Sequence, residues 1–280
     1  MILKEKILSR KLLFWIGALL AGLLVAGAIV VIILLNSPKK EHPTPTTEPT
    51  PTYTPPEETT LKPEDFVYEG GYLTCTAAPT KLGIDVSQHQ GDIDWVQVKD
   101  AGVSFAIIRV GGRGYGTEGS IYNDDLSQTY YEGAKAAGID VGVYFFSQAI
   151  TSEEAAEEAD FVLQQIEGWE LGMPVVYDWE RLDGDTRTVN ADPRTVTDCM
   201  KTFCEKVEAN GYEAMVYFNP DHSDSMFYIE EVTGYDFWLA LYTDWMTYPY
   251  KVDMWQYTNQ GTVPGIEGNV DINLYFPEAE

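Results

Sequence analysis

The sequence contains few residues that could bind a metal ion or form disulfides. Only three cysteines and three histidines occur among 280 residues. His42, His89 and His222 are scattered, and no cysteine pair has the C-x-x-C spacing of a zinc or redox site. We therefore expect no metal and no cofactor. Cys199 and Cys204 fall on a predicted helix, where we expect them to be core residues.

Basic residues are also scarce. The chain has 18 Lys and Arg against 44 Asp and Glu, a formal net charge of −26. Residues 1–80 contain 7 of these basic and 8 of these acidic residues, so 11 basic residues stand against 36 acidic ones beyond residue 80. A nucleic-acid-binding surface needs a basic patch, and this composition excludes that class of partner. Solubility accounts for most of the acidity, which also suits an uncharged or cationic ligand.

One long uncharged segment is present near the N-terminus. Residues 12–35 are apolar without a charged side chain, and a helix of that length spans about 36 Å, enough to cross a bilayer core of about 30 Å. Four basic residues precede the segment and two follow it closely. Because excess positive charge stays cytoplasmic, we expect a cytoplasmic basic tail at 1–11 and a single-pass anchor in the cell membrane at 12–35, with the rest of the chain extracellular. A cleaved signal peptide is the alternative, since "AGA" at 26–28 resembles a cleavage site.

The next segment has the composition of a spacer. Residues 36–79 are dominated at first by Pro, Thr and Glu, which predicts an extended, partly polyproline II linker. Residues 80–280 have the length of one large domain, and we expect it to be monomeric.

Eight short apolar segments with turn residues at both ends predict strands in this domain: 81–87, 105–112, 139–147, 173–180, 212–219, 236–243, 251–258 and 269–276. Helical patterns at 94–102, 126–138, 151–168 and 192–211 separate the first five. Alternating strands and helices favour a parallel sheet covered by helices. Only seven and ten residues separate the last three strands, too few for helical crossovers. The pattern predicts an α/β fold, an irregular TIM-like barrel.

Two carboxylates end the fourth predicted strand. Asp178 and Glu180 point to the same side of that strand, about 6.6 Å apart along the backbone, and Trp179 points to the other side. Two acids so close cannot share one pKa, so the better buried one stays protonated. Glycoside hydrolysis uses such a pair, one acid to protonate the leaving oxygen and one carboxylate to assist. The alternative is an ordinary solvated acidic pair in an acidic protein.

Other candidate site residues lie at the ends of neighbouring predicted strands. Asp85 ends the first strand and Asp271 begins the last. Strand ends of such a barrel meet at one mouth, so four carboxylates should meet there. Arg109 is expected to be an interior partner for an acid. Aromatic and amide side chains on the same strands are the candidates for substrate binding: Tyr144, Tyr217, Asn219, Trp238, Tyr242, Trp255 and Gln256.

Five segments carry a specific resemblance: "GIDVSQHQGDIDWVQVKDAGVSFAIIRVG", "GIDVGVYFFS", "PVVYDWE", "WLALY" and "MWQYTNQGTVPGIEGNVDINLYF". In this order they resemble the glycoside hydrolase family 25 lysozymes, the Chalaropsis-type N-acetylmuramidases. The resemblance implies a (β/α)5(β)3 barrel that cleaves the β-1,4 bond from N-acetylmuramic acid to N-acetylglucosamine in peptidoglycan. It implies that Glu180 is the general acid, Asp178 its partner carboxylate, and Asp85 and Asp271 the remaining acids of the groove. Phe145 replaces a histidine common in that family, which we expect to affect substrate preference.

Three functions are compatible with these residues. A catalytic muramidase is favoured because all four acids are present, with Glu180 expected to be the carboxyl that is protonated at rest. A non-catalytic module that binds cell-wall glycan is one alternative. A hydrolase of another amino-sugar polymer, such as chitin, is the other.

Overall fold

The computed structural model describes residues 53–182 and 184–277. The expected tail at 1–11, the expected anchor at 12–35 and residues 36–52 of the expected linker lie outside these ranges. No helix within the described ranges is long and apolar enough to cross a membrane. Residues 53–280 form one compact unit.

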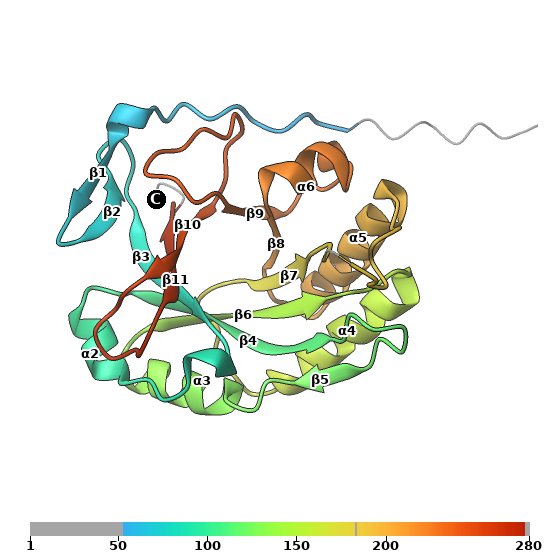
Figure 1. Cartoon of the computed structure of the whole chain (residues 1–280), viewed down its shortest axis with the longest axis horizontal. Helices are drawn as coiled ribbons and strands as arrows, with labels where there is room; N and C mark the ends of the chain where they lie inside the picture. Colours follow the sequence, from blue (N-terminus) through green and yellow to red (C-terminus); the bar gives the residue numbers. More distant parts are fainter. Residues whose placement is uncertain (1–52, 183, 278–280) are drawn as a thin grey trace, which may run out of the picture. The chain divides into compact units, whose positions relative to one another are not determined.

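Eight strands of the nine-stranded central sheet (Figure 1) each overlap a predicted one: β3 (Lys81–Val86), β4 (Phe105–Arg113), β6 (Asp140–Ser147), β7 (Val175–Trp179), β8 (Ala214–Phe218), β9 (Asp236–Ala240), β10 (Met254–Gly261) and β11 (Val270–Tyr275). The helices are α2 (Trp95–Asp100), α3 (Ser127–Ala136), α4 (Ser152–Gln165), α5 (Pro193–Ala209) and α6 (Pro220–Ser225). The first four were predicted. The short α6 was not, because its six residues carry too little periodicity.

The eight strands close into a barrel. Their order is β3-β11-β10-β9-β8-β7-β6-β4, and β3 also pairs with β4. The neighbouring strands β3, β4, β6, β7, β8, β9 and β10 are parallel to one another. The remaining strand, β11, runs antiparallel to both of its neighbours, β10 and β3. Five strand–helix units followed by three strands without full helices confirm the expected (β/α)5(β)3 arrangement. The ninth strand, the short β5 (Ile121–Asn123), pairs antiparallel with the end of β4.

Helix ends follow ordinary capping chemistry. The side-chain oxygen of Thr151 accepts a hydrogen bond of 3.2 Å from the backbone NH of Glu154 at the start of α4. Asp192 Oδ1 likewise accepts a hydrogen bond of 3.1 Å from the backbone NH of Thr195, at the start of α5. These side chains satisfy backbone donors that a helix start leaves unpaired.

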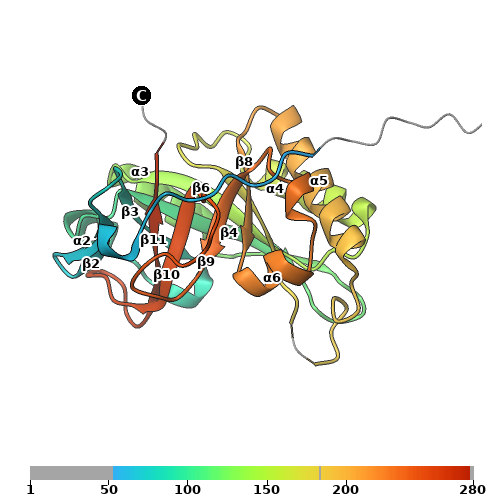
Figure 2. The ribbon, with the colours of Figure 1, turned by 90° about the horizontal axis from the view of Figure 1, so that it is seen from above.

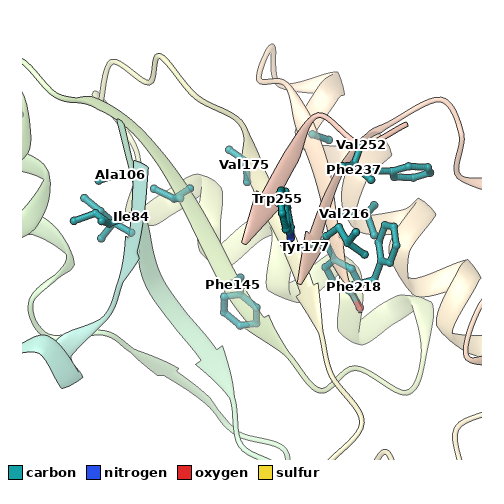
Figure 3. Close-up of a cluster of buried hydrophobic side chains, with 14 of the residues drawn as sticks. Ile84, Ala106, Phe145, Val175, Tyr177, Val216, Phe218, Phe237, Val252 and Trp255 are labelled. Carbon is teal, nitrogen blue, oxygen red and sulfur yellow. The ribbon is translucent and has the colours of Figure 1, made fainter. Parts of the chain in front are cut away.

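Two apolar clusters occupy the two faces of the barrel sheet. The larger one lies between strands and helices, where Figure 3 shows Phe145, Tyr177 and Trp255 among its side chains. The smaller one fills the barrel interior, and Phe105 belongs to it. Gly83 makes room for that ring, since a Cβ there would come within 2.2 Å of it. Alternation along each strand thus separates outward packing residues from inward ones.

Residues 53–79 differ from the linker expected at 36–79. They belong to the compact unit and contain a hairpin of β1 (Phe66–Glu69) and β2 (Tyr72–Cys75), beside β3 and β11 in Figure 2. Phe66 and Leu73 are buried, and the Phe66 ring packs edge-on against Trp255 at 5.1 Å. The expected boundary at residue 80 is therefore wrong for this segment. Gly70 and Gly71, both at positive φ, form the two-residue turn that could have indicated the hairpin.

Candidate active site

The four predicted acids meet in one pocket. Asp85 comes from β3, Asp178 and Glu180 from β7 and its end, and Asp271 from β11. The pocket has a volume of about 230 Å³. Its other lining residues are Arg109, Tyr144, Phe146, Tyr217, Trp238, Tyr242, Gln256 and Asn259. Side chains from all eight barrel strands or their ends thus converge at the mouth where the parallel strands end, the usual site of chemistry in such barrels.

Asp85 and Asp271 form the first carboxyl pair. They are directly opposite each other in the β11–β3 register. Asp85 Oδ2 accepts hydrogen bonds from Gln256 Nε2 at 2.9 Å and Asn273 Nδ2 at 2.8 Å. Burial, and then the charge of Asp271, raise the pKa of Asp85 well above its ordinary value despite these two amides. Burial raises the pKa of Asp271 to about 6.

Asp178 and Glu180 form the second pair. Each carboxyl group shifts the pKa of the other, and Asp178 Oδ1 is buried without a hydrogen-bond partner among the described residues. Burial raises the pKa of Asp178 well above its ordinary value, and the neighbouring Glu180 adds to this shift. Burial also raises the pKa of Glu180. Asp178 is the more deeply buried of the two, at 5% exposed, whereas Glu180 is partly exposed.

Trp179 points away from this pair, as expected from strand alternation. It is 1% exposed, and its indole NH donates to the carbonyl of Ala149 at 3.0 Å. The backbone carbonyl of Glu180 accepts a hydrogen bond of 2.6 Å from Gln148 Nε2. Thr188 Oγ1 donates to Gln148 Oε1 at 3.1 Å. These bonds fix the end of β7 and therefore the direction of the Glu180 side chain.

Arg109 is the only cationic side chain that lines the pocket within the described part of the chain. Its Nε donates to Asp124 Oδ2 at 2.8 Å, and Asp124 is fully buried. This confirms the expectation of an interior partner for an acid. The guanidinium also lowers the pKa of Asp178, but less than burial raises it.

Aromatic rings form the wall of the pocket. The Trp238 ring contacts Tyr217 edge-on at 4.9 Å and Tyr144 at 6.3 Å. The hydroxyls of Tyr217 and Tyr242 donate to Gln256 Oε1 at 3.1 and 3.0 Å. Gln256 in turn donates to Asp85, so two phenols fix the amide that binds this carboxyl. These four aromatic residues and Gln256 lie where substrate binding was predicted.

Two predicted site residues lie elsewhere. Trp255 is fully buried on the outward face of β10, and its indole NH donates to the carbonyl of Leu241 at 2.7 Å. Because Gln256 points inward, its neighbour must point outward, so the prediction for Trp255 was wrong. Asn219 caps α6 by accepting a hydrogen bond of 3.0 Å from the NH of His222, and it does not line the pocket.

Phe145 also differs from expectation. It is fully buried and packs against Phe161 of α4 at 5.7 Å, on the helix side of the sheet. Its neighbours Tyr144 and Phe146 line the pocket instead. Phe145 therefore contributes to packing between β6 and α4 and does not line the pocket.

The sequence prediction missed Phe146, Asn259 and Asn273. Asn273 lies two residues beyond Asp271 on β11, so strand alternation places it on the same inward face. It donates to Asp85 and accepts from the Trp238 indole NH at 2.8 Å. Asn259 follows a register shift in β10, where alternation no longer predicts the direction of a side chain.

The three cysteines are buried and free, as expected for Cys199 and Cys204. Within the described ranges, no cluster of His, Cys, Asp or Glu could hold a metal ion.

A strand–helix barrel with paired carboxyl groups at the carboxyl ends of its strands defines a glycoside hydrolase by class. Residues 84–266 match the family model described as glycosyl hydrolases family 25. The chain belongs to this family.

Known relatives agree with that assignment. Lysozyme M1 of Streptomyces globisporus is 29% identical over 208 residues, covering 69% of this chain and 67% of that protein. The autolytic lysozyme of Clostridium acetobutylicum is 27% identical over 201 residues, covering 69% of this chain and 55% of that protein. A solved structure of the modular autolysin LytC from Streptococcus pneumoniae, in complex with a synthetic peptidoglycan ligand, has a TM-score of 0.63 at 23% identity and shares the fold. The match covers 75% of this chain and 52% of LytC, so the chain spans about half the length of these last two relatives.

Proposed function

We propose that the chain is an N-acetylmuramidase that cleaves the β-1,4 bond between N-acetylmuramic acid and N-acetylglucosamine in peptidoglycan. The observation that carries this proposal is the meeting of four carboxyl groups, each with a raised pKa, in one aromatic-lined pocket of a family 25 barrel. The names of two relatives as lysozymes, and the peptidoglycan ligand in the LytC structure, support the same substrate.

Glu180 is proposed as the general acid. It lies just past the end of β7 and is partly exposed, and its raised pKa favours the protonated form. Its proton passes to the leaving oxygen of N-acetylglucosamine as the glycosidic bond breaks. Water adds to the anomeric carbon of muramic acid, and the proton that this water loses returns to a carboxylate. Asp178 stabilises the charge that develops on the sugar, either as a base or by orienting the acetamido group.

The aromatic wall is proposed to bind the sugar rings. Tyr144, Tyr217, Trp238 and Tyr242 line the pocket, and aromatic surface suits the apolar faces of pyranoses. Tyr242, at 51% exposed, offers the most accessible of these rings. Gln256, Asp85 and Asp271 supply acceptors and donors for hydroxyl and acetamido groups.

Replacing Glu180 tests the proposal directly. Glu180→Gln should lower the release of soluble fragments from purified peptidoglycan at least about 100-fold, because the leaving oxygen loses its proton donor. Thermal unfolding should stay close to wild type. Glu170→Gln is the matched control, since Glu170 is exposed near the opposite end of β7. Release by Glu180→Gln at the wild-type rate would refute the assignment of the acid.

Two alternatives are separated by the products. A wall-binding module would bind peptidoglycan without releasing reducing ends. A hydrolase of another amino-sugar polymer would act better on chitin than on peptidoglycan. Mass spectrometry of reduced digestion products decides among the three, because a muramidase leaves muramic acid at the new reducing end.

The cellular placement of the chain is also a proposal. Residues 12–35 would anchor a monomer in the cell membrane, with the barrel on the wall side, as their apolar composition indicates. Deleting residues 1–35 should move the protein from the membrane fraction to the soluble fraction. Sedimentation of that truncated chain should give the mass of one copy.

A further inference from the structure

A second pocket adjoins the active site. It has a volume of about 500 Å³, within the range of about 300–1,000 Å³ that small-molecule sites occupy. Tyr242 and Asn259 line both pockets, so the second one begins where the active site ends. Its far wall consists of Tyr68 and Tyr72 from the β1–β2 hairpin, which precedes the region matched by the family model. The pocket is thus built partly by a segment outside that match.

The hairpin is fixed in place by bonds to the barrel. The hydroxyl of Tyr68 donates to Asp244 Oδ1 at 2.9 Å, and the hydroxyl of Tyr72 donates to the carbonyl of Thr262 at 3.3 Å. The backbone NH of Leu73 donates to the hydroxyl of Tyr257 at 3.3 Å. Tyr68 nevertheless leaves 55% of its surface exposed, and Tyr242 leaves 51%. Two pre-positioned rings therefore remain accessible to a ligand.

The side chains that line this pocket favour an uncharged sugar over a charged peptide. Apart from Asp244, the polar side chains are hydroxyls and amides, mainly from residues 258–262. No Lys or Arg lines this pocket within the described residues. Peptide stems carry carboxylates, which would lack a cationic partner here and would face Asp244. Neutral sugar rings need aromatic faces together with hydroxyl and amide partners, and the pocket offers both.

We propose that this pocket, the tyrosine groove (Tyr68, Tyr72, Tyr242 and residues 258–262), is an additional subsite for uncharged rings of the glycan strand beyond those at the four acids. The inference rests on the proposed muramidase function. It predicts that long strands are bound more tightly than short ones, because only long strands occupy both pockets.

Tyr68→Ala tests the groove on glycan strands stripped of their peptides. Each muramic acid of these strands then carries a free lactyl carboxylate, so the uncharged ring expected in the groove is N-acetylglucosamine. For long strands the KM should rise about three- to tenfold with kcat unchanged, the effect of losing one aromatic contact. For strands of two disaccharides, which extend less far, KM should stay at the wild-type value. Tyr228→Ala is the control, because Tyr228 is also exposed but lines neither pocket. Tyr68→Phe, which keeps the ring, should retain most of the long-strand affinity.

The outcomes separate the two proposals. If Tyr68→Ala changes KM equally for both strand lengths, or changes it for neither, the tyrosine groove is not a glycan subsite. An effect confined to strands that still carry peptides would overturn it in favour of a peptide site. If the wild-type chain releases no muramic acid reducing ends, the proposed function itself fails.

Discussion

At the scale of single residues, burial is the dominant force on the acids of the pocket. Taking a carboxylate out of water disfavours its charged form, and a second carboxylate nearby adds to the penalty. Burial is the first cause of the raised pKa of Asp85, Asp178, Glu180 and Asp271. The raised pKa values are therefore a consequence of the position of these acids in the barrel, and they favour the protonated form that the proposed reaction needs.

The same shifts predict how stability depends on pH. A carboxyl whose pKa is raised on folding stabilises the protein below its unfolded pKa, and this stabilisation is lost as pH rises through the folded pKa. For Asp271 this stabilisation is lost between pH 3.8, its ordinary pKa, and about pH 6, its pKa in the folded protein. We expect Asp271→Asn to raise the melting temperature at pH 7 by a few degrees, corresponding to at most about 3 kcal/mol, and to have little effect near pH 4. Scanning calorimetry at both pH values measures this, and equal effects at the two pH values would contradict it.

Gln148 is predicted to be a positioning residue for Glu180. It is fully buried and bonds the carbonyl of Glu180, but it does not line the pocket. Gln148→Leu removes that bond, so the Glu180 side chain should be misdirected and kcat should fall about tenfold with little change in KM. Thr188→Val removes only the bond to Gln148 Oε1 and should have a smaller effect. A loss of stability without any change in kcat would show a purely structural role for Gln148.

At the scale of secondary-structure elements, the strands were the most predictable feature. Each of the eight combines apolar residues with turn residues at its ends, and buried parallel strands leave this pattern in sequence. The direction of individual side chains was less predictable. Alternation correctly paired Asp178 with Glu180, and it should have excluded Trp255 once Gln256 was chosen. It could not place Asn259, because the register shift in β10 breaks the period.

The β1–β2 hairpin shows where composition misleads. Pro, Thr and Glu dominate the preceding segment, but Phe66 and Leu73 supply enough apolar surface to bind the hairpin to the barrel. Phe66→Ala should destabilise the protein by about 3 kcal/mol, because it leaves a cavity against Trp255. The melting temperature should fall by at least about 6 °C, whereas Glu69→Ala, at an exposed position of the same hairpin, should change it by less than about 2 °C. Equal melting temperatures for the two variants would show that the hairpin contributes nothing to global stability.

At the scale of the whole molecule, the dominant feature is the net negative charge of the barrel domain. The pocket is lined by four of the 36 acidic residues beyond residue 80, and its Arg109 is paired with Asp124. Most of the acidity beyond residue 80 must therefore lie on the remaining surface. Such a field repels polyanions at long range and weakens as salt screens it.

This field makes a prediction for the natural substrate. Bacterial walls that carry anionic polymers should repel the barrel at low ionic strength, where the Debye length is about 30 Å at 0.01 M, and less at 0.15 M, where it is about 8 Å. We expect the digestion rate of such walls to increase several-fold between these salt concentrations. Walls stripped of the polymers should show a much smaller increase, because less charge opposes the approach of the barrel. Release of soluble fragments measures both rates on the same preparation before and after stripping. The same salt dependence for both wall types would place the effect in the active site rather than in the surface field, because the active site meets the same glycan in each.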